Sequence, residues 1–521
     1  MVQPVAREKE EEPRRTKIFR EFGGCYTRAP RFACPPDRLY NCENAIPISD
    51  GNIAIVPNIS AQIIDYGVDQ IYWSQYGNVG GTDYLINFSL SGKVFAYNIA
   101  SGVSSQINAA QILTGANGRM AQWKRQVLLF VDSAGYYYWD GTTFAKLTGT
   151  GVPSSGDDIA VQFGRVWILQ GRLLAFSGVD GFGGGTPVIP DATNYWTVAN
   201  GSGSVNLTDP TIRSAVRRLS AQNGYLYLIS ESAINSISGV NVPAGAVPPT
   251  PILDNTNVQA IIGTDQPAAV MPYDRLMMFA NRYGVYALYG VSAERLSTDI
   301  DGTWQYVDFS QPLSAGPVVV NNILHAAFLL KRKGDPVFGS NTVIALWFDQ
   351  KWWFANFGPI TFIVSGMLNN AWALFGFIGN KLYQFFADTS TGPAVNIQTP
   401  LFAMEDQLAD KQVIRAGFEV ATQTITGSFT LTLDTPTGSL PMTTNTTLSA
   451  GLWVNAAGTT GQWVNGIGTV GSWFPPAFLL YSGDPPAGYG KYVGFTLSTT
   501  SAVFQVASFD MDYKLRGRWN S

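Results

Sequence analysis

The sequence contains few of the residues on which catalytic and metal sites are usually built. Of its 521 residues, one is a histidine, His325, and three are cysteines, Cys25, Cys34 and Cys42. Three clustered cysteines with no further cysteine or histidine nearby fit neither a disulfide framework nor a complete zinc site. We therefore expect reduced thiols. His325 lies in the apolar run ILHAAFLL and no G-x-S-x-G nucleophile motif accompanies it, so we expect a structural role.

Charged residues are also scarce, and neither sign dominates. Asp, Glu, Lys and Arg together make up 13% of the chain, and the formal net charge is −4. Binding of nucleic acid depends on many Lys and Arg contacts to phosphate, so a basic DNA-binding surface is not expected. Acid–base catalysis needs tuned ionisable groups in a cleft, and few candidates exist. We predict a protein that is not an enzyme and needs no cofactor or metal.

Long apolar runs are missing as well. The segment REKEEEPRRTK at residues 7–17 lacks the apolar stretch of a signal peptide, and later apolar runs are far shorter than a membrane span. We expect assembly in the cytoplasm and no membrane insertion. Residues 1–45 are predicted to form a charged, partly irregular arm, which either wraps a neighbouring molecule or, over its first fifteen or so residues, stays disordered.

Glycine and aromatic residues are plentiful and occur in a recurring pattern. Glycine fills 54 positions, and aromatics equal the charged residues at 13%. An apolar run, a Gly, Asn or Asp turn and an aromatic strand recur in GKVFAY, GYYYWDGTTF, GRVWILQGRLLAF, GYLYLI, YGVYALYG and NKLYQFF. Each phrase predicts a β-hairpin. Because one hairpin cannot bury its apolar face alone, the repetition predicts an all-β fold with a β-propeller of six to eight blades over residues 46–390.

Residues 391–521 differ in texture and are predicted to form a β-rich, sandwich-like domain. No charged side chain occurs in residues 435–483, where Trp453, Trp463 and Trp473 recur every ten residues. This period puts the three side chains on one face of a strand or at matching places on successive hairpin arms. They either form an exposed platform for a partner subunit or sugar, or fill a sandwich core, which is the commoner place for apolar residues.

The best helical candidate is the stretch around residues 209–219. Asp209 and Pro210 could open a turn of helix, with Arg213, Arg217 and Arg218 on one side. Three arginines on one side could clamp a phosphate or the carboxylates of a partner. A solvated face is the alternative interpretation.

Two motifs invite an enzymatic interpretation. The phrase STDIDGTWQYV at residues 297–307 approaches the "Asp box" of sialidases, with Ser297, Asp299, Thr303 and Trp304 in place, but Asp301 stands where the glycine belongs. That box is a turn motif of propeller blades without a catalytic group. The glycine-rich GFGGGTP at residues 181–187 lacks the Lys-Ser/Thr ending of a phosphate loop, so it is expected to be a flexible loop.

Several longer segments resemble one family of viral proteins. GRVWILQGRLLAFSG, followed by DATNYWTV and LSAQNGYLYLISESAINSISG, is similar to the central region of tail nozzle proteins of short-tailed bacteriophages. These are also called packaged-DNA stabilisation or tail-hub proteins. IQTPLFAMEDQLADKQVIRAGFEV at residues 397–420 and the ending DMDYKLRGRW at residues 510–519 resemble the closing domain of that family. The uncharged insertion near residues 435–483 departs from the family pattern.

The resemblance implies a structural virion protein of the viral tail. Such proteins form a ring, here a hexamer, below the portal and adaptor; the ring extends the channel, retains the packaged genome and conducts DNA during ejection. Expected partners are other copies of the chain, the tail adaptor (head-to-tail connector) protein, a tail fibre, tailspike or needle, and transiently the passing DNA. The alternative is a sialidase-like propeller glycosidase or a glycan-binding tail protein for host attachment. Candidate partner contacts are Arg213, Arg217, Arg218, Trp453, Trp463, Trp473, Lys514, Arg516 and Arg518.

Overall fold

The computed structural model divides the chain into two compact units. It describes residues 13–48, 51–114, 116–179, 189–191, 195–210, 212–241, 252–259, 261–290, 292–334, 342–420, 424–436, 438–449, 463–464, 470–471, 489–500 and 504–516. One unit consists of Ile59–Gln350 and Phe357–Ala387, and the other of Met1–Asn58, Lys351–Asn356 and Asp388–Ser521. We call them the propeller unit and the sandwich unit.

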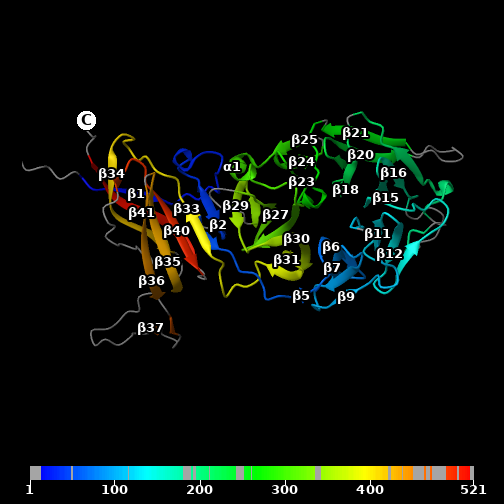
Figure 1. The fold of residues 1–521 in the computed structure, drawn as a ribbon, viewed down its shortest axis with the longest axis horizontal. Helices are drawn as coiled ribbons and strands as arrows, with labels where there is room; N and C mark the ends of the chain where they lie inside the picture. The colour runs from blue at the N-terminus through cyan, green and yellow to red at the C-terminus, as the bar shows by residue number, and fades with distance from the viewer. Residues whose placement is uncertain are drawn as a thin grey trace, which may run out of the picture. The chain divides into compact units, whose positions relative to one another are not determined.

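Most of the propeller unit is built from four-stranded antiparallel sheets of consecutive strands (Figure 1). Five sheets have this form. Their strands are β6 (Ile71–Val79), β7 (Thr82–Ser89), β8 (Val94–Asn98) and β9 (Ser104–Gln106); β10 (Arg119–Trp123), β11 (Val127–Asp132), β12 (Gly135–Trp139) and β13 (Phe144–Leu147); β14 (Asp158–Gln162), β15 (Arg165–Gln170), β16 (Leu173–Phe176) and β17 (Gly203–Asn206); β18 (Val216–Gln222), β19 (Tyr225–Ser230), β20 (Ile234–Asn241) and β21 (Ile252–Gln259); and β22 (Val270–Tyr273), β23 (Leu276–Asn281), β24 (Gly284–Tyr289) and β25 (Ser292–Arg295).

Two further sheets complete the ring. One contains β26 (Ser314–Val320), β27 (Ile323–Lys331) and β28 (Thr342–Phe348) within this unit, and the other contains β30 (Ile360–Leu368), β31 (Ala371–Ile378) and β32 (Lys381–Phe385). The early strand β5 (Ile64–Asp65) pairs with β32, so the first and last parts of the unit share a sheet. The first strands of successive sheets contact one another, and β30 contacts β6. Among the described residues the propeller therefore has seven blades and closes on itself, as Figure 1 shows.

Turn chemistry explains why the sequence folds into hairpins at these places. In five blades the first and second strands are joined by two residues that both have positive φ. The pairs are Gly80–Gly81, Phe163–Gly164, Asn223–Gly224, Asn321–Asn322 and Asn369–Asn370. Two consecutive left-handed residues characterise the type I′ turn, whose twist matches that of the flanking strands and which favours Asn and Gly. The hairpins predicted from the turn residues and aromatic strands are confirmed.

The apolar faces of the blades pack against one another. One cluster of buried side chains joins the β6–β9 sheet to its neighbours on both sides, and three more fill the spaces between successive blades up to β24. The aromatic hairpin strands supply many of these side chains, including Tyr97, Trp139, Trp167 and Tyr227. The predicted reason for a propeller, that one sheet cannot bury its own apolar face, thus describes how the core is built.

The sandwich unit contains two larger sheets. In one, the strand order is β3 (Ala45–Pro47), β4 (Ile53–Ile55), β41 (Gln505–Arg516), β34 (Asp410–Val420) and β39 (Tyr489–Gly490). The other contains, within this unit, β29 (Lys351–Ala355), β2 (Asn41–Glu43), β33 (Val395–Gln398), β40 (Gly494–Thr500), β35 (Thr424–Thr435) and β36 (Gly438–Ser449). The rings of Phe495 in β40 and Phe509 in β41 stack with centroids 5.8 Å apart, which joins the two sheets through their shared core. The prediction of an all-β chain with a propeller and a sandwich-like domain is confirmed.

Residues near the N-terminus take part in the sandwich unit. Strand β1 (Arg15–Phe19) pairs antiparallel with β41, and ion pairs link Arg14 to Asp512 and Arg15 to Glu405. Phe19 is buried, and its ring contacts those of Phe22, Phe402 and Phe509. The described part of residues 1–45 therefore includes an edge strand with an aromatic anchor, β1, and a strand inside the other sheet, β2.

The helix expected near residues 209–219 does not form. The chain is irregular before Val216 and then enters β18, the innermost strand of its blade. Val216 and Leu219 are buried. These apolar residues belong to a strand and not to a helix, since the segment Val216–Gln222 pairs with β19, with a β-bulge between Val216 and Arg218.

Candidate functional site

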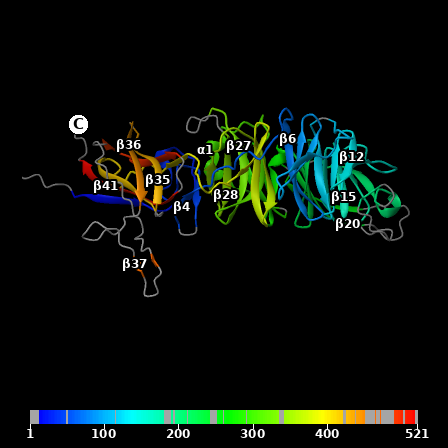
Figure 2. The same cartoon turned by 90° about the horizontal axis from the view of Figure 1, so that it is seen from below.

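Polar contacts join the loops and turns at one end of the propeller. Because adjacent strands alternate in direction, the loop before each innermost strand and the turn between the second and third strands lie at the same end of every blade (Figure 2). We call this end the loop face. Carboxylates on it are engaged in holding loops and turns together, as the following contacts show.

In each of the first three blades, an aspartate joins the loop before the first strand to the turn between the second and third strands. Asp69 accepts hydrogen bonds from Lys93 Nζ (2.9 Å) and Ser91 Oγ (2.7 Å). Burial acts to raise the pKa of Asp69, but the bonds from Lys93 and Ser91 outweigh it and hold the pKa below its ordinary value. The Thr114 and Ala134 amides donate to Asp132 (2.7 and 2.9 Å), and the Gly171 amide donates to Asp157 (2.6 Å).

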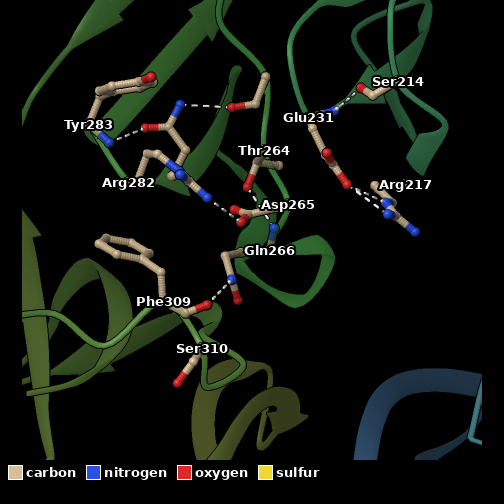
Figure 3. Close-up of polar contacts among 12 residues, drawn as sticks. Ser214, Arg217, Glu231, Thr264, Asp265, Gln266, Arg282, Tyr283, Phe309 and Ser310 are labelled. Carbon is tan, nitrogen blue, oxygen red and sulfur yellow. Dashed lines mark hydrogen bonds and ion pairs between the residues drawn. The ribbon is translucent and has the colours of Figure 1, made fainter.

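The fourth and fifth blades carry ion pairs instead. Figure 3 shows Arg217 directed toward Glu231 and Arg282 toward Asp265. The N···O distances are 2.6 and 3.4 Å. The Glu231 amide donates to Ser214 Oγ (3.2 Å), which ties the turn to the preceding loop. Both pairs are open to solvent, so each contributes at most about 1 kcal/mol to stability.

A second group of polar residues lies on the axis of the propeller. Arg119 and Asp158 are the first residues of β10 and β14, and Trp73 and Arg218 are the third residues of β6 and β18. These innermost strands all begin at the loop face. The Arg119 guanidinium lies 3.9 Å and that of Arg218 5.3 Å from the centroid of the Trp73 ring. We call Trp73, Arg119, Asp158 and Arg218 the axial cluster.

The axial cluster contains a completely buried carboxylate. Asp158 accepts hydrogen bonds from the Leu219 amide (2.6 Å) and from Arg218 Nη1 (3.2 Å). Burial lowers the pKa of Arg119, Asp158 acts in the opposite direction, and the second arginine lowers it further. Guanidinium groups over a tryptophan face gain cation–π attraction, which is stronger where water is excluded.

The structure separates the three arginines that the sequence grouped together. Arg213 is exposed in the loop before β18. Arg217 and Arg218 are neighbours on β18, where a β-bulge interrupts the pairing, and they have different partners: Arg217 pairs with Glu231 and Arg218 with Asp158. They do not form one clamp. The members of the axial cluster that the sequence does not point to, Trp73, Arg119 and Asp158, come from other blades.

The C-terminal candidates are only partly within the described residues. Trp463 lies in the short strand β37 (Trp463–Val464), which pairs with β38 (Val470–Gly471). Lys514 is half-buried in β41, and Arg516 is the last residue of that strand. Trp453, Trp473 and Arg518 lie outside the described residues, as does the whole glycine-rich segment at residues 181–187. Their role as partner contacts stays a prediction.

The motif that resembles an Asp box forms a buried structural turn. Ser297 accepts a hydrogen bond from the Val285 amide (3.0 Å), and the indole of Trp304 donates to the Asn281 carbonyl (3.2 Å). Ser297, Thr303 and Trp304 are buried, and the segment forms a 3-10 turn followed by α1 (Asp301–Trp304). These side chains hold the loop against the blade of β22–β25.

The remaining chemically reactive residues are buried. Cys25, Cys34 and Cys42 are buried and form no disulfide, and burial raises the pKa of Cys25 and Cys42. His325 is enclosed in β27. Within the described ranges, no group of three or more His, Cys, Asp or Glu side chains is placed to hold a metal ion, and no helix is long and apolar enough to cross a membrane.

Comparison with known proteins adds no functional name. No protein-family model and no curated protein matches the chain. Among solved structures it is similar to the WD40 repeats of RRP9 (10% identity, 64% of this chain and 99% of that chain, TM-score 0.38). It is also similar to YCF48 bound to a D1 peptide (9%, 65% and 100%, 0.35) and to the Cps50 (Swd1) β-propeller domain of Myceliophteria thermophila (9%, 64% and 99%, 0.36). Similarity at this level concerns the fold alone.

Proposed function

We propose that the chain is a structural protein of a short-tailed bacteriophage tail, which assembles into a ring-shaped nozzle below the portal and adaptor. The observation that carries this proposal is the sequence resemblance to nozzle proteins, which falls on both compact units. It includes strands β15, β16, β19 and β20 of the propeller and strands β34 and β41 of the sandwich. In this proposal the ring retains packaged DNA and conducts it during ejection.

The axial cluster bears on how such a protein would form a channel. Trp73 in β6 and Arg218 in β18 come from blades that are not adjacent, so their contact crosses the propeller axis. Side chains therefore close the axis of a single propeller at this level. A duplex would have to pass through the centre of a ring of several chains, in which each propeller is a rigid wall element. Closed rings repeat one heterologous interface without producing an open filament.

The charge of the chain suits a wall along which DNA slides. The net charge is −4, and the loop-face arginines described above, Arg217 and Arg282, are each paired with a carboxylate. A wall of this kind lacks the multiple phosphate contacts that would hold DNA in place. Virion-tail location, ring formation and the adaptor partner belong to the same proposal.

The mass of the purified protein in solution tests ring formation directly. Sedimentation equilibrium is expected to give six times the monomer mass, and a monomer at all concentrations would contradict the proposal. A screen of sialosides and bacterial glycans distinguishes the alternative, because turnover or binding by the monomer would instead indicate a glycosidase or glycan-binding protein.

Charge reversal tests one candidate contact within the ring. The double variant Arg516→Glu with Arg518→Glu is expected to dissociate the ring, whereas Arg282→Glu, which changes a paired loop-face arginine, serves as the control. Intact rings in the double variant would remove this ending from the subunit interface.

A further inference from the structure

The axial cluster holds one more positive than negative charge. Arg119 and Arg218 each carry a guanidinium, and Asp158 is the carboxylate between their strands, since β14 belongs to the blade between those of β10 and β18. The exposed Asp157 accepts the Gly171 amide at the adjoining turn and, like Asp158, acts to raise the pKa of Arg119. The Tyr72 hydroxyl accepts the Gly118 amide (2.7 Å), and burial raises the pKa of Tyr72 to about 12, so this phenol stays neutral.

The two arginines are satisfied to different degrees. Arg218 reaches Asp158, and its side chain is only 15% exposed. Arg119 donates through Nη1 to the Gly118 carbonyl (2.9 Å) and forms no ion pair with any described carboxylate. The Nε atoms of both arginines are buried and have no hydrogen-bond partner among the described residues. A buried charge without a counter-charge is costly, typically several kcal/mol, unless another group compensates it.

We propose that the loop-face end of the propeller axis binds one carboxylate group, held by the guanidinium groups of Arg119 and Arg218. One carboxylate neutralises the excess charge of the axial cluster, whereas a doubly charged phosphate would overcompensate it. Planar guanidinium forks match carboxylate geometry, and the Trp73 ring beneath them fixes their orientation. The group can come from a free carboxylate or from a glutamate side chain presented by a partner. The site does not depend on ring formation.

Thermal unfolding of the full chain provides the test, with acetate and with glutamate blocked at both its amino and α-carboxyl groups as probes. At matched ionic strength, both are expected to raise the midpoint of the propeller transition relative to chloride. The effect is expected to disappear in Arg119→Met. The rise in the midpoint should persist in the control Arg217→Met. This variant removes an arginine from the same strand, β18, that pairs with Glu231 and is not part of the axial cluster.

A second property keeps the proposal testable if the probes bind weakly. In chloride, Arg119→Met is expected to unfold at a higher temperature than the wild type, because burial disfavours the Arg119 charge and no ion pair holds it, while the variant retains an apolar stem over Trp73. A response to blocked glutamate alone would indicate a side chain as the source. Equal midpoints in chloride and in both probes, or a response to inorganic phosphate alone, would overturn the proposal.

Discussion

His325 makes the stability of the propeller depend on acidity in a predictable way. The imidazole is fully buried in β27, where Nδ1 lies 2.9 Å from the Ile323 carbonyl oxygen and the ring lies 5.5 Å from that of Phe348. Nε2 is buried without a partner. Burial lowers the pKa of His325 from 6.5 to about 4, although the bond to Ile323 acts in the opposite direction.

The difference in the pKa of His325 between the unfolded and folded chain sets the sign and size of the change in stability with pH. Between pH 6.5 and about 4, the unfolded chain binds a proton at His325 that the folded chain does not. The free energy of unfolding therefore falls as the pH decreases through this range, by up to about 1.4 kcal/mol per pH unit. Above pH 6.5, the pKa of His325 in the unfolded chain, the imidazole is neutral in both states and none of this stability is lost. About 3 kcal/mol is expected to be lost near pH 4.

Urea unfolding, followed by intrinsic fluorescence at a series of pH values, measures this contribution. The carboxylates titrate in the same range, so the useful quantity is the difference in pH dependence between the wild type and His325→Leu. The wild type is expected to lose about 3 kcal/mol more than the variant on going from neutral pH to near pH 4. His325→Gln, which keeps a polar side chain, should behave like the leucine variant. Parallel pH profiles for all three proteins would refute the reasoning.

Three other substitutions probe the cores and the axis. Phe509→Ala removes a buried ring at the centre of the sandwich unit and should destabilise that unit by about 3–5 kcal/mol in chemical unfolding; a loss below about 1 kcal/mol would contradict the proposed packing. Gly263→Ala would place its Cβ 1.9 Å from the Ser230 carbonyl oxygen, so we expect a loss of about 1–3 kcal/mol and a lower melting temperature; an unchanged melting temperature would show that the loop adapts freely. Asp158→Ala leaves Arg218 buried without its partner and should lower the free energy of unfolding by about 3–5 kcal/mol. Adding Arg218→Met should recover part of that loss. If the effects of the two substitutions on the free energy of unfolding simply add, Asp158 and Arg218 do not interact.

The sequence allowed the fold to be predicted because its signals are local. Asn-Gly and Gly-Gly turns such as Asn223–Gly224 and Gly80–Gly81 specify type I′ hairpins within a few residues. The closure of the ring is different, because β5 pairs with β32 more than 300 residues later through only two residues. So short a strand has no detectable period, and its partner is chosen by tertiary packing.

Most of the axial cluster could not be predicted from the sequence, because its contacts also depend on tertiary structure. The sequence places Arg217 and Arg218 in one basic cluster, but on strand β18 they pair with different carboxylates, Glu231 and Asp158. Val216 and Leu219 are also spaced as a helix would require, and a β-bulge between Val216 and Arg218 disturbs the alternation that would have indicated a strand. Trp73, Arg119 and Asp158 meet only because the ring brings first strands of different blades together. These residues are far apart in the sequence, and no local pattern predicts their contact.

Electron microscopy of the purified protein, alone and mixed with a cognate portal–adaptor complex, tests the proposed nozzle most directly. Class averages are expected to show six-fold rings with an open channel between the chains, and a collar that extends the portal. Each propeller should remain closed on its own axis at the axial cluster. Single particles that ignore the portal would contradict the account.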